Sequence, residues 1–355
     1  MRPALHLLPT QFVDSPIGRD GAVARLAGGM QWFAAYDVIE GDTRRSMSIA
    51  DFNATLGASD ERAAARHAAI TAPRAPLILG ERVLRLDQPH VAGILNVTPD
   101  SFSDGGALHD DPQAAADAGF DMIAKGAALI DLGGESTRPG ASLLWEGDEI
   151  KRIAPVVERL ARTAPVSIDT RKAAVMEAAL ARGAHMVNDV SALIWDSRSA
   201  EVVARAGVPV VLMHSPDPAK GPHGGGGYRD VLIETFDWLE ARVEAAATAG
   251  IDRAKIIVDP GIGFGKALSD NLALLGGLAL FHGLGCPIML GASRKRMIGA
   301  LSNEAPVGER LGGSLALALK GADAGVQLLR VHDVAETVQA LRVWRGMRDA
   351  ALVGR

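Results

Sequence analysis

The chain has 355 residues, of which 48% are hydrophobic and 22% charged, and its formal net charge is −5. This composition is typical of a globular protein with a large core, and the charge does not indicate binding to nucleic acid or to a membrane surface. The single cysteine, Cys286, excludes an internal disulfide and is compatible with a reducing compartment. The first residues also lack the long apolar segment of a signal peptide, so we expect a cytoplasmic protein.

Residues 1–76 form neither a repeat nor a low-complexity segment. Trp32, Phe33 and Tyr36, together with the alanine-rich stretch 60–71, indicate a small folded extension. A unit of this size is marginal alone, so we expect it to pack on the remaining chain or on a neighbouring subunit. No motif in it indicates a role.

Eight short apolar runs follow, each ending in a polar or charged residue and separated by helix-length segments. They occupy residues 92–96, 128–135, 165–169, 185–189, 209–214, 255–259, 287–293 and 327–332. Continuous Val/Ile/Leu runs without alternation are typical of parallel strands buried on both faces. Eight strand–helix units predict an α/β fold, a TIM (β/α)8 barrel spanning residues 77–355, with 1–76 as a small N-terminal extension.

Helix signals recur between these runs. Asp111 and Pro112 are typical of an N-cap and a first helical position, and Gly126 marks the end of that helix. Apolar spacing around residues 150–160 predicts another helix, which we expect to begin at Pro155 because proline is disfavoured inside helices. The uncharged stretch 271–293 contains several Gly and Pro residues, so it is interpreted as a helix and a strand rather than a membrane span.

Three long segments follow the first, second and fifth predicted strands: 98–106, 136–147 and 215–228. Irregular loops of this length in a compact domain commonly bind ligands or close over them. The glycine run at 224–227 is interpreted as a flexible linker, because no phosphate-binding Lys-Ser or Lys-Thr follows it.

Polar residues at the strand ends fall into two groups. The first is Asp169, Asn188 and Asp259, whose carboxylates and amide suit a flat heterocycle with N–H donors and a carbonyl. The second is an arc of cations that would hold an anion, because the last two strands of such barrels often bind phosphate. Its members are Arg138, Lys295, Arg330 and His332, while Asn96 and Asp131 also lie at strand ends.

Structural alternatives apply to several of these residues. Asp169 is as well suited to capping the next helix, and Asn188–Asp189 to a turn. His214 is interpreted as a packed residue rather than a ligand. No His/Cys/Asp pattern has zinc spacing, so a metal held by protein ligands alone is not expected. GIGFGK (261–266) matches neither common phosphate-loop pattern.

Seven motifs resemble dihydropteroate synthase, in the order of that family and over roughly residues 77–348. They are GILNVTPDSFSDGG (93–106), DLGGESTRPGA (131–141), SIDTRK (167–172), VNDVSAL (187–193), DPGIGFGK (259–266), SRKRMIG (293–299) and RVHDV (330–334). The resemblance implies a transferase of folate biosynthesis and a sulfonamide target. It would condense hydroxymethyl-dihydropterin diphosphate with p-aminobenzoate to give 7,8-dihydropteroate and pyrophosphate.

The resemblance also implies residue roles. Asp169, Asn188, Asp259 and Lys295 would hold the pterin, with Met213 and Phe264 packing against it, and Asp169, Lys295 and Asp259 would be catalytic. Thr137, Arg138, Arg330 and His332 would bind the diphosphate, and Asn96 would ligate Mg2+, the expected cofactor. Ser101, Phe102, Pro139 and Phe264 would form the aminobenzoate pocket. The family is usually dimeric through its late helices, here 309–322 and 334–345, so a homodimer is expected.

Two positions depart from the common family pattern. His214-Ser-Pro-Asp-Pro follows the fifth strand, where the family usually has a longer methionine–glutamine–glycine sequence, and Arg296 replaces a frequent serine. Both changes place the aminobenzoate pocket in more doubt than the pterin site. Two other functions remain open: a corrinoid-type methyltetrahydrofolate methyltransferase, which needs no NVTPDSFSDGG loop, and a non-catalytic pterin-binding paralogue.

Overall fold

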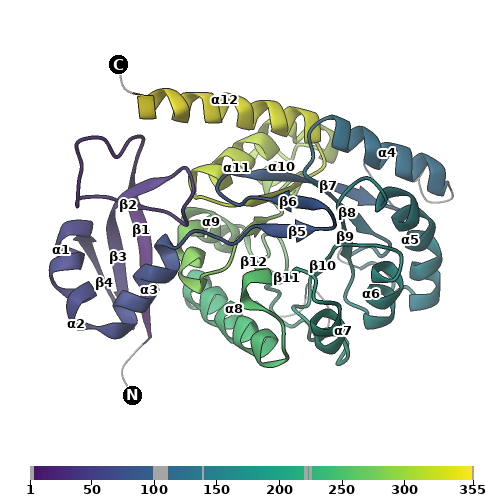
Figure 1. The fold of residues 1–355 in the computed structure, drawn as a ribbon, viewed down its shortest axis with the longest axis horizontal. Coiled ribbons are helices and arrows are strands. Elements are labelled where there is room, and N and C mark those ends of the chain that lie inside the picture. The colour runs from purple at the N-terminus through teal and green to yellow at the C-terminus, as the bar shows by residue number, and fades with distance from the viewer. Residues whose placement is uncertain (1–3, 99–110, 138–139, 220–222, 224–225, 354–355) are drawn as a thin grey trace.

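The structure is a computed structural model that describes residues 4–98, 111–137, 140–219, 223 and 226–353. Eight parallel strands form one sheet in the order β12-β11-β10-β9-β8-β7-β14-β13 (Figure 1). A further parallel bridge between Val258 and Ile288 joins the two ends of this sheet and nearly closes the barrel. The predicted (β/α)8 architecture is confirmed. The strands are β7 His90–Asn96, β8 Leu129–Gly133, β9 Val166–Asp169, β10 Met186–Asp189, β11 Val210–Met213, β12 Ile256–Asp259, β13 Met289–Leu290 and β14 Leu328–Val331.

Burial on both faces explains the uninterrupted apolar runs. Every residue of β10, β11 and β12 is buried, because one face points into the barrel and the other contacts the surrounding helices. The polar residues at the strand ends therefore meet at one end of the barrel.

Helices cover the outside of the barrel (Figure 1). The helix α4 begins where predicted: the Asp111 side chain accepts hydrogen bonds from the backbone of Gln113 and Ala114, and Gly126 follows with a positive φ of 105°. The helices are α4 Pro112–Ala124, α5 Glu146–Leu160, α6 Ala173–Leu180, α7 Ser199–Ala206, α8 Val231–Thr248, α9 Leu268–Gly276, α10 Arg296–Leu301, α11 Leu311–Asp323 and α12 Val334–Val353, with 3-10 turns η1 Arg253–Lys255, η2 Leu278–Leu284 and η3 Val307–Glu309.

The expected start of α5 at Pro155 is wrong, because the helix begins at Glu146 and runs through the proline. Proline removes one backbone hydrogen bond from a helix interior. Here Ile153 and Leu160, on either side of Pro155, are both buried. Acidic residues in the first turn also suit the positive end of the helix dipole. Tertiary packing of α5 thus outweighs the low preference of proline for a helix interior.

The N-terminal extension has its own antiparallel sheet and hydrophobic core (left in Figure 1). Phe33, Tyr36, Phe52 and Ile70 are fully or almost fully buried within it. Its elements are β1 Leu5–Val13, β2 Ala24–Arg25, β3 Trp32–Glu40, β4 Thr43–Ser48, α1 Ile49–Ala54, α2 Leu56–Ser59 and α3 Glu61–Thr71.

The extension packs on the barrel through η2. Arg74 donates to the carbonyl of His282 at 3.0 Å, and Arg66 donates to that of Gly283 at 2.7 Å. Because η2 connects α9 to β13, the extension stabilises the outer wall of the barrel near its last strands.

The hairpin of β5 Leu77–Leu79 and β6 Arg82–Leu84 lies between the extension and the first barrel strand. Leu77, Leu79 and Leu86 form one cluster with apolar residues of the barrel strands, among them Leu129 and Met186. The hairpin thus closes the amino-terminal end of the barrel and leaves the carboxyl-terminal end for a ligand.

The uncharged stretch 271–293 forms part of α9, η2 and β13, as expected of a segment within the fold. None of the helices in the described ranges has the length and hydrophobicity that a membrane span requires.

Candidate active site

A cavity with an empty volume of about 660 Å³ lies at the carboxyl ends of the barrel strands. Most of the predicted site residues line it, although they are separated by up to 234 positions in the chain. The lining consists of Asn96, Thr98, Glu135, Ser136, Thr137, Asp169, Asn188, Val190, Met213, Asp259, Phe264, Gly291, Lys295 and Arg330. The placement follows from the fold, because Asn96, Asp169, Met213 and Asp259 are each the last residue of a strand.

An ion-paired group forms the floor of this cavity. Arg330 donates through Nη2 to Asp169 at 2.6 Å and through Nε to Asp131. Asn188 donates its amide to the same Asp131 oxygen at 2.9 Å. Asp131 is completely buried, so these donors replace the water that its carboxylate loses on folding.

This arrangement resolves two of the alternatives. Asp169 does not cap α6, because its carboxylate pairs with Arg330 while Asp196 accepts the hydrogen bond from Ala173 at the start of that helix. Asn188 points into the site. Its neighbour Asp189 is the turn residue, accepting bonds from Ser191 and Leu193.

Of the expected arc of cations, Arg138 lies outside the described residues and Arg330 is paired with two carboxylates. Burial acts to lower the pKa of Arg330, but the Asp131 and Asp169 carboxylates outweigh it and hold the pKa above its usual value. Burial, followed by the nearby Arg330, lowers the pKa of His332 to about 3, so that its ring is neutral near pH 7. His332 is not among the residues that line the cavity, and its Nδ1 lies 3.0 Å from the hydroxyl of Ser293. Which charged groups lie beside Arg330 and His332 depends on tertiary packing, which the spacing of residues in the sequence does not reveal.

Lys295 lies beside Asp259 and Phe264. Its ammonium is 4.1 Å from the centre of the Phe264 ring and donates to the carbonyl of Ile262. Burial, and secondarily the positive charge of Arg330, lowers the pKa of Lys295 to about 8 although Asp259 opposes the shift. Burial likewise raises the pKa of Asp259, which accepts a 2.7 Å hydrogen bond from the backbone of Gly261.

The GIGFGK segment is held by hydrogen bonds to its own backbone. The ammonium of Lys266 donates to the carbonyls of Gly261 at 2.8 Å and Phe264 at 3.3 Å. Burial, with a further contribution from Lys295, lowers the pKa of Lys266 to about 7. Lys266 thus holds Phe264 in place. His214 is packed as expected, with its ring 5.0 Å from that of Trp238.

Five residues of the cavity lining were not among the predicted site residues: Thr98, Glu135, Ser136, Val190 and Gly291. His223, beside the lining residue Phe264, was not predicted either. His223 stacks on Phe264 at 5.2 Å between ring centres and lies 2.8 Å from the carbonyl of Thr137. Glu135 lines the cavity next to Ser136 and Thr137. The position of Glu135 within the DLGGEST motif was a usable signal, whereas nothing in the sequence distinguishes His223 from its glycine-rich surroundings.

The predicted residues Ser101, Phe102, Arg138 and Pro139 lie outside the described residues. Among the residues that the structure does describe, no group of three or more His, Cys, Asp or Glu side chains is suited to hold a metal ion.

Comparisons with known proteins agree with this geometry. The pterin binding enzyme family matches residues 92–332. The dihydropteroate synthase of Escherichia coli K12 is 46% identical over 262 residues, which are 73% of this chain and 92% of that protein. The Bacillus subtilis enzyme is 42% identical over 72% of this chain and 88% of its own length.

Solved structures give the same result. The Xanthomonas albilineans dihydropteroate synthase with 4-aminobenzoic acid is 46% identical, with a TM-score of 0.72, covering 78% of this chain and 99% of that one. The same enzyme in complex with 7,8-dihydropteroate has a TM-score of 0.69 at 45% identity, with the same coverage. The carboxyl-end cavity, its acidic and amide lining and these relatives lead to one conclusion: the chain belongs to the pterin binding enzyme family, within the dihydropteroate synthase branch.

Proposed function

We propose that this protein is a dihydropteroate synthase. It condenses hydroxymethyl-dihydropterin diphosphate with p-aminobenzoate, giving 7,8-dihydropteroate and pyrophosphate in folate biosynthesis. The observation that carries the proposal is one cavity walled by Asp169, Asn188, Asp259 and Lys295, in a chain 46% identical to an enzyme of that name. Buried carboxylates and an amide match the N–H groups of a pterin edge, and a lysine matches its carbonyl.

The reaction breaks the carbon–oxygen bond between the pterin methylene and the diphosphate and forms a carbon–nitrogen bond to the aryl amine. The electron pair leaves with pyrophosphate, and the amine proton passes to solvent. Asp169 and Asp259 stabilise the electron-poor methylene centre, while Lys295 orients the ring. An aryl amine attacks as a neutral nucleophile, so the site needs no strong general base.

A Mg2+ ion fits this site as a cofactor bound together with the diphosphate. Mg2+ usually takes few protein ligands when phosphate oxygens are present, and we propose the Asn96 carboxamide oxygen as its protein ligand. When bound, the ion would neutralise charge on the leaving group. Arg138, Thr137, Arg330 and His332 are proposed diphosphate contacts, although Arg330 must serve its carboxylate partners as well.

The second substrate is proposed to bind on the outer side of Phe264, towards Ser101, Phe102 and Pro139. The stacking of His223 on Phe264 adds one residue to this wall. We further propose that the protein acts in the cytoplasm as a homodimer.

Purified protein with Mg2+ and both substrates is expected to release pyrophosphate and form dihydropteroate, and to release little pyrophosphate without aminobenzoate. Tight pterin binding without product would instead support a non-catalytic paralogue. Preference for methyltetrahydrofolate over the pterin diphosphate would support a methyltransferase.

A further inference from the structure

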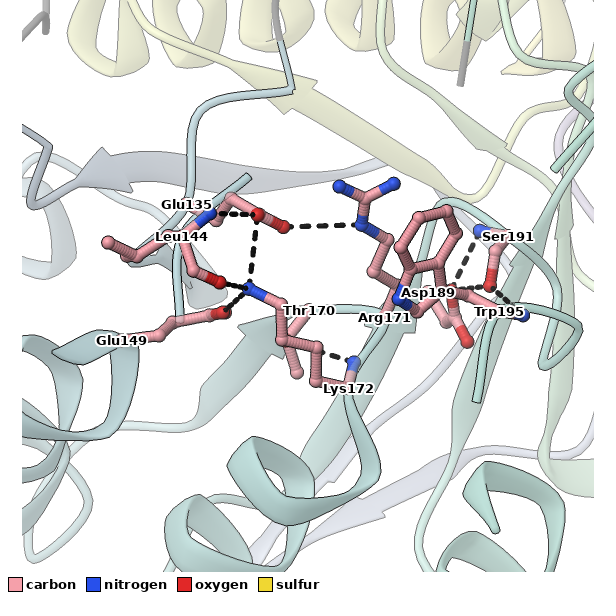
Figure 2. Close-up of polar contacts among 9 residues, drawn as sticks. All are labelled: Glu135, Leu144, Glu149, Thr170, Arg171, Lys172, Asp189, Ser191 and Trp195. Atoms are coloured by element: carbon pink, nitrogen blue, oxygen red, sulfur yellow. Dashed lines mark hydrogen bonds and ion pairs between the residues drawn. The ribbon is translucent and has the colours of Figure 1, made fainter. Parts of the chain in front are cut away.

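A buried network of charges connects the two described ends of the β8–α5 loop, residues 134–137 and 140–145 (Figure 2). Four charged side chains form it: Glu135, Glu149, Arg171 and Lys172. Their side chains are at most 10% exposed, and that of Glu149 is fully buried. Groups of this kind are rarely buried unless they are paired, so their positions need an explanation.

The network joins the two ends of the loop. Glu135, near its start, accepts a 3.0 Å hydrogen bond from the backbone N–H of Leu144, near its end. Lys172 donates to the carbonyl of the same Leu144 at 2.6 Å and lies 3.0 Å from Glu135. The backbone N–H of Leu144 therefore donates to the negative Glu135, and the backbone carbonyl of Leu144 accepts from the positive Lys172, as Figure 2 shows.

The remaining members hold Glu135 and Lys172 in place. Glu149 lies 2.6 Å from the ammonium of Lys172, and Arg171 lies 3.2 Å from Glu135. The Arg171 guanidinium in turn stacks 3.9 Å over the ring of Trp195. Two carboxylates face two cations, which satisfies the condition under which buried charges are tolerated.

The charge state of Glu135 supports this arrangement. Burial acts to raise the pKa of Glu135, but the Leu144 N–H, Arg171 and Lys172 together outweigh it and leave the pKa lowered. Glu135 is thus ionised near neutral pH and acts as an acceptor for all three donors.

The network reaches the proposed active site from two sides. Ser136 and Thr137 follow Glu135 directly and line the cavity. Arg171 and Lys172 follow Asp169, whose carboxylate lies on the cavity floor. The same side chains thus tie a wall of the cavity to the strand that carries a pterin-binding carboxylate.

We propose that Glu135 and Lys172 are positioning residues that clamp the two ends of the β8–α5 loop and hold Thr137 over the cavity. The proposal rests on the proposed function, in which Thr137 binds the diphosphate and this loop borders the second substrate. Tying the loop ends removes conformational freedom before the substrates bind, which lowers the entropy lost on binding. We expect the pterin ring to bind independently of this clamp, because Arg330, and not Glu135 or Lys172, holds the Asp169 carboxylate.

The test replaces Lys172 by methionine, which keeps an unbranched side chain and removes the charged ammonium. We expect amide hydrogen exchange of residues 140–145 to accelerate about tenfold or more. The KM for aminobenzoate is expected to rise at least about fivefold, with a smaller change in kcat. The Kd of 6-hydroxymethylpterin, which lacks the diphosphate, is expected to stay within about twofold of the wild-type value.

Lys125→Met is the matched control, because it breaks an exposed ion pair with Asp121 at the end of α4 that leads into β8. It is expected to leave all three measurements unchanged. Lys172→Arg restores a positive charge and is expected to recover part of the lost exchange protection. If Lys172→Met does not fold, Glu135→Gln, which keeps an oxygen acceptor for Leu144, decides by the same measurements.

Unchanged loop exchange and an unchanged KM for aminobenzoate in a folded variant would overturn the proposal. A parallel loss of affinity for 6-hydroxymethylpterin would also overturn it, because it would indicate general damage to the barrel. Hydrogen exchange and pterin binding can be measured without turnover. An inactive wild-type protein would therefore refute the proposed function, while these two measurements would still test whether Glu135 and Lys172 clamp the loop.

Discussion

At the scale of single residues, the site is governed by desolvation and pairing of charges. Asp131, Asp169 and Asp259 lie near Arg330 and Lys295, and Lys266 also acts on Asp259. The carboxylate oxygens can accept hydrogen bonds from a ligand that brings N–H donors. The protonation state of Lys295 affects both this balance of charges and the binding of such a ligand.

Lys295 is expected to limit activity at alkaline pH. Its pKa is lowered to about 8, chiefly by burial, so it carries its proton below that pH and loses it above. The plot of kcat/KM for the pterin diphosphate against pH should therefore fall above about 8. In Lys295→Arg, whose side chain stays protonated, this alkaline limb should disappear.

Lys295→Ala is expected to lose at least about 2 kcal/mol of transition-state stabilisation, measured from kcat/KM. A wild-type pH profile that remains flat through this range, or wild-type turnover in Lys295→Ala, would show that the lysine does not donate to the substrate.

Arg330→Ala is expected to affect folding as well as activity. The substitution leaves the fully buried Asp131 without its main counterion, and breaking a buried pair in this way costs about 3–5 kcal/mol. Urea unfolding should show this loss of free energy. Arg85→Ala, which breaks the exposed 2.7 Å pair with Asp87, should change stability by less than about 1 kcal/mol. Equal stability of the two variants would contradict the assignment of Arg330 as the counterion of Asp131.

At the scale of elements, the loop after β12 depends on one glycine. Gly261 has a positive φ of 68°, and a Cβ there would lie 1.9 Å from the carbonyl oxygen of His214. The loop carries Phe264 and Lys266, so a shift here reaches the cavity wall. Packing against a neighbouring strand end, rather than a phosphate, explains the glycine.

Gly261→Ala should therefore destabilise the protein by at least about 2 kcal/mol, combining backbone strain with a steric clash. Gly227→Ala is the control, because Gly227 also has a positive φ, 82°, but no atom lies within 4 Å of the added Cβ. It should cost about 1–2 kcal/mol from strain alone. Thermal unfolding of both variants measures the difference, and a smaller effect at Gly261 would disprove the close contact.

At the scale of the whole molecule, the barrel depends on packing at its outside. Arg74 is buried and donates to the carbonyls of Ala69, Ala72 and His282, which links the extension to η2. Arg348 on α12 donates to Asp14 and to the carbonyl of Met30 in the same way. The extension thus spans two parts of the outer wall.

Deletion of residues 1–76 is expected to lower the Tm by at least about 5 °C, because these buried hydrogen bonds and the apolar contact with η2 are lost. The folded fraction should still bind 6-hydroxymethylpterin, since no residue of the extension lines the cavity in the part of the chain that the structure describes. Calorimetry and pterin titration test the two halves of this prediction. Loss of pterin affinity in folded protein would show that the extension shapes the site.

The proposed dimer is tested on α12. Val343 and Met347 lie one turn apart and are 60% and 63% exposed, so an apolar strip remains for a partner copy. Met347→Glu should shift the protein to monomer in light scattering coupled to gel filtration. Val83→Glu, at a 61% exposed position of β6, should not. Identical masses for the wild-type protein and Met347→Glu would exclude this face.

The sequence by itself determined the barrel, the order of its strands and the strand-end part of the cavity lining. These features follow from local patterns: apolar runs buried on both faces, capping residues such as Asp111, and the rule that parallel strands present their last residues at one end. The places of Thr137, Met213 and Phe264 in the cavity lining were expected from the family resemblance alone. Tertiary structure alone decided that Arg330 pairs with Asp131 and Asp169, that the buried ring of His332 is neutral, and that α5 runs through Pro155. It also decided that Lys172 reaches Leu144. Each depends on distances between segments far apart in the chain and on the loss of water around buried charges, which a linear pattern does not encode.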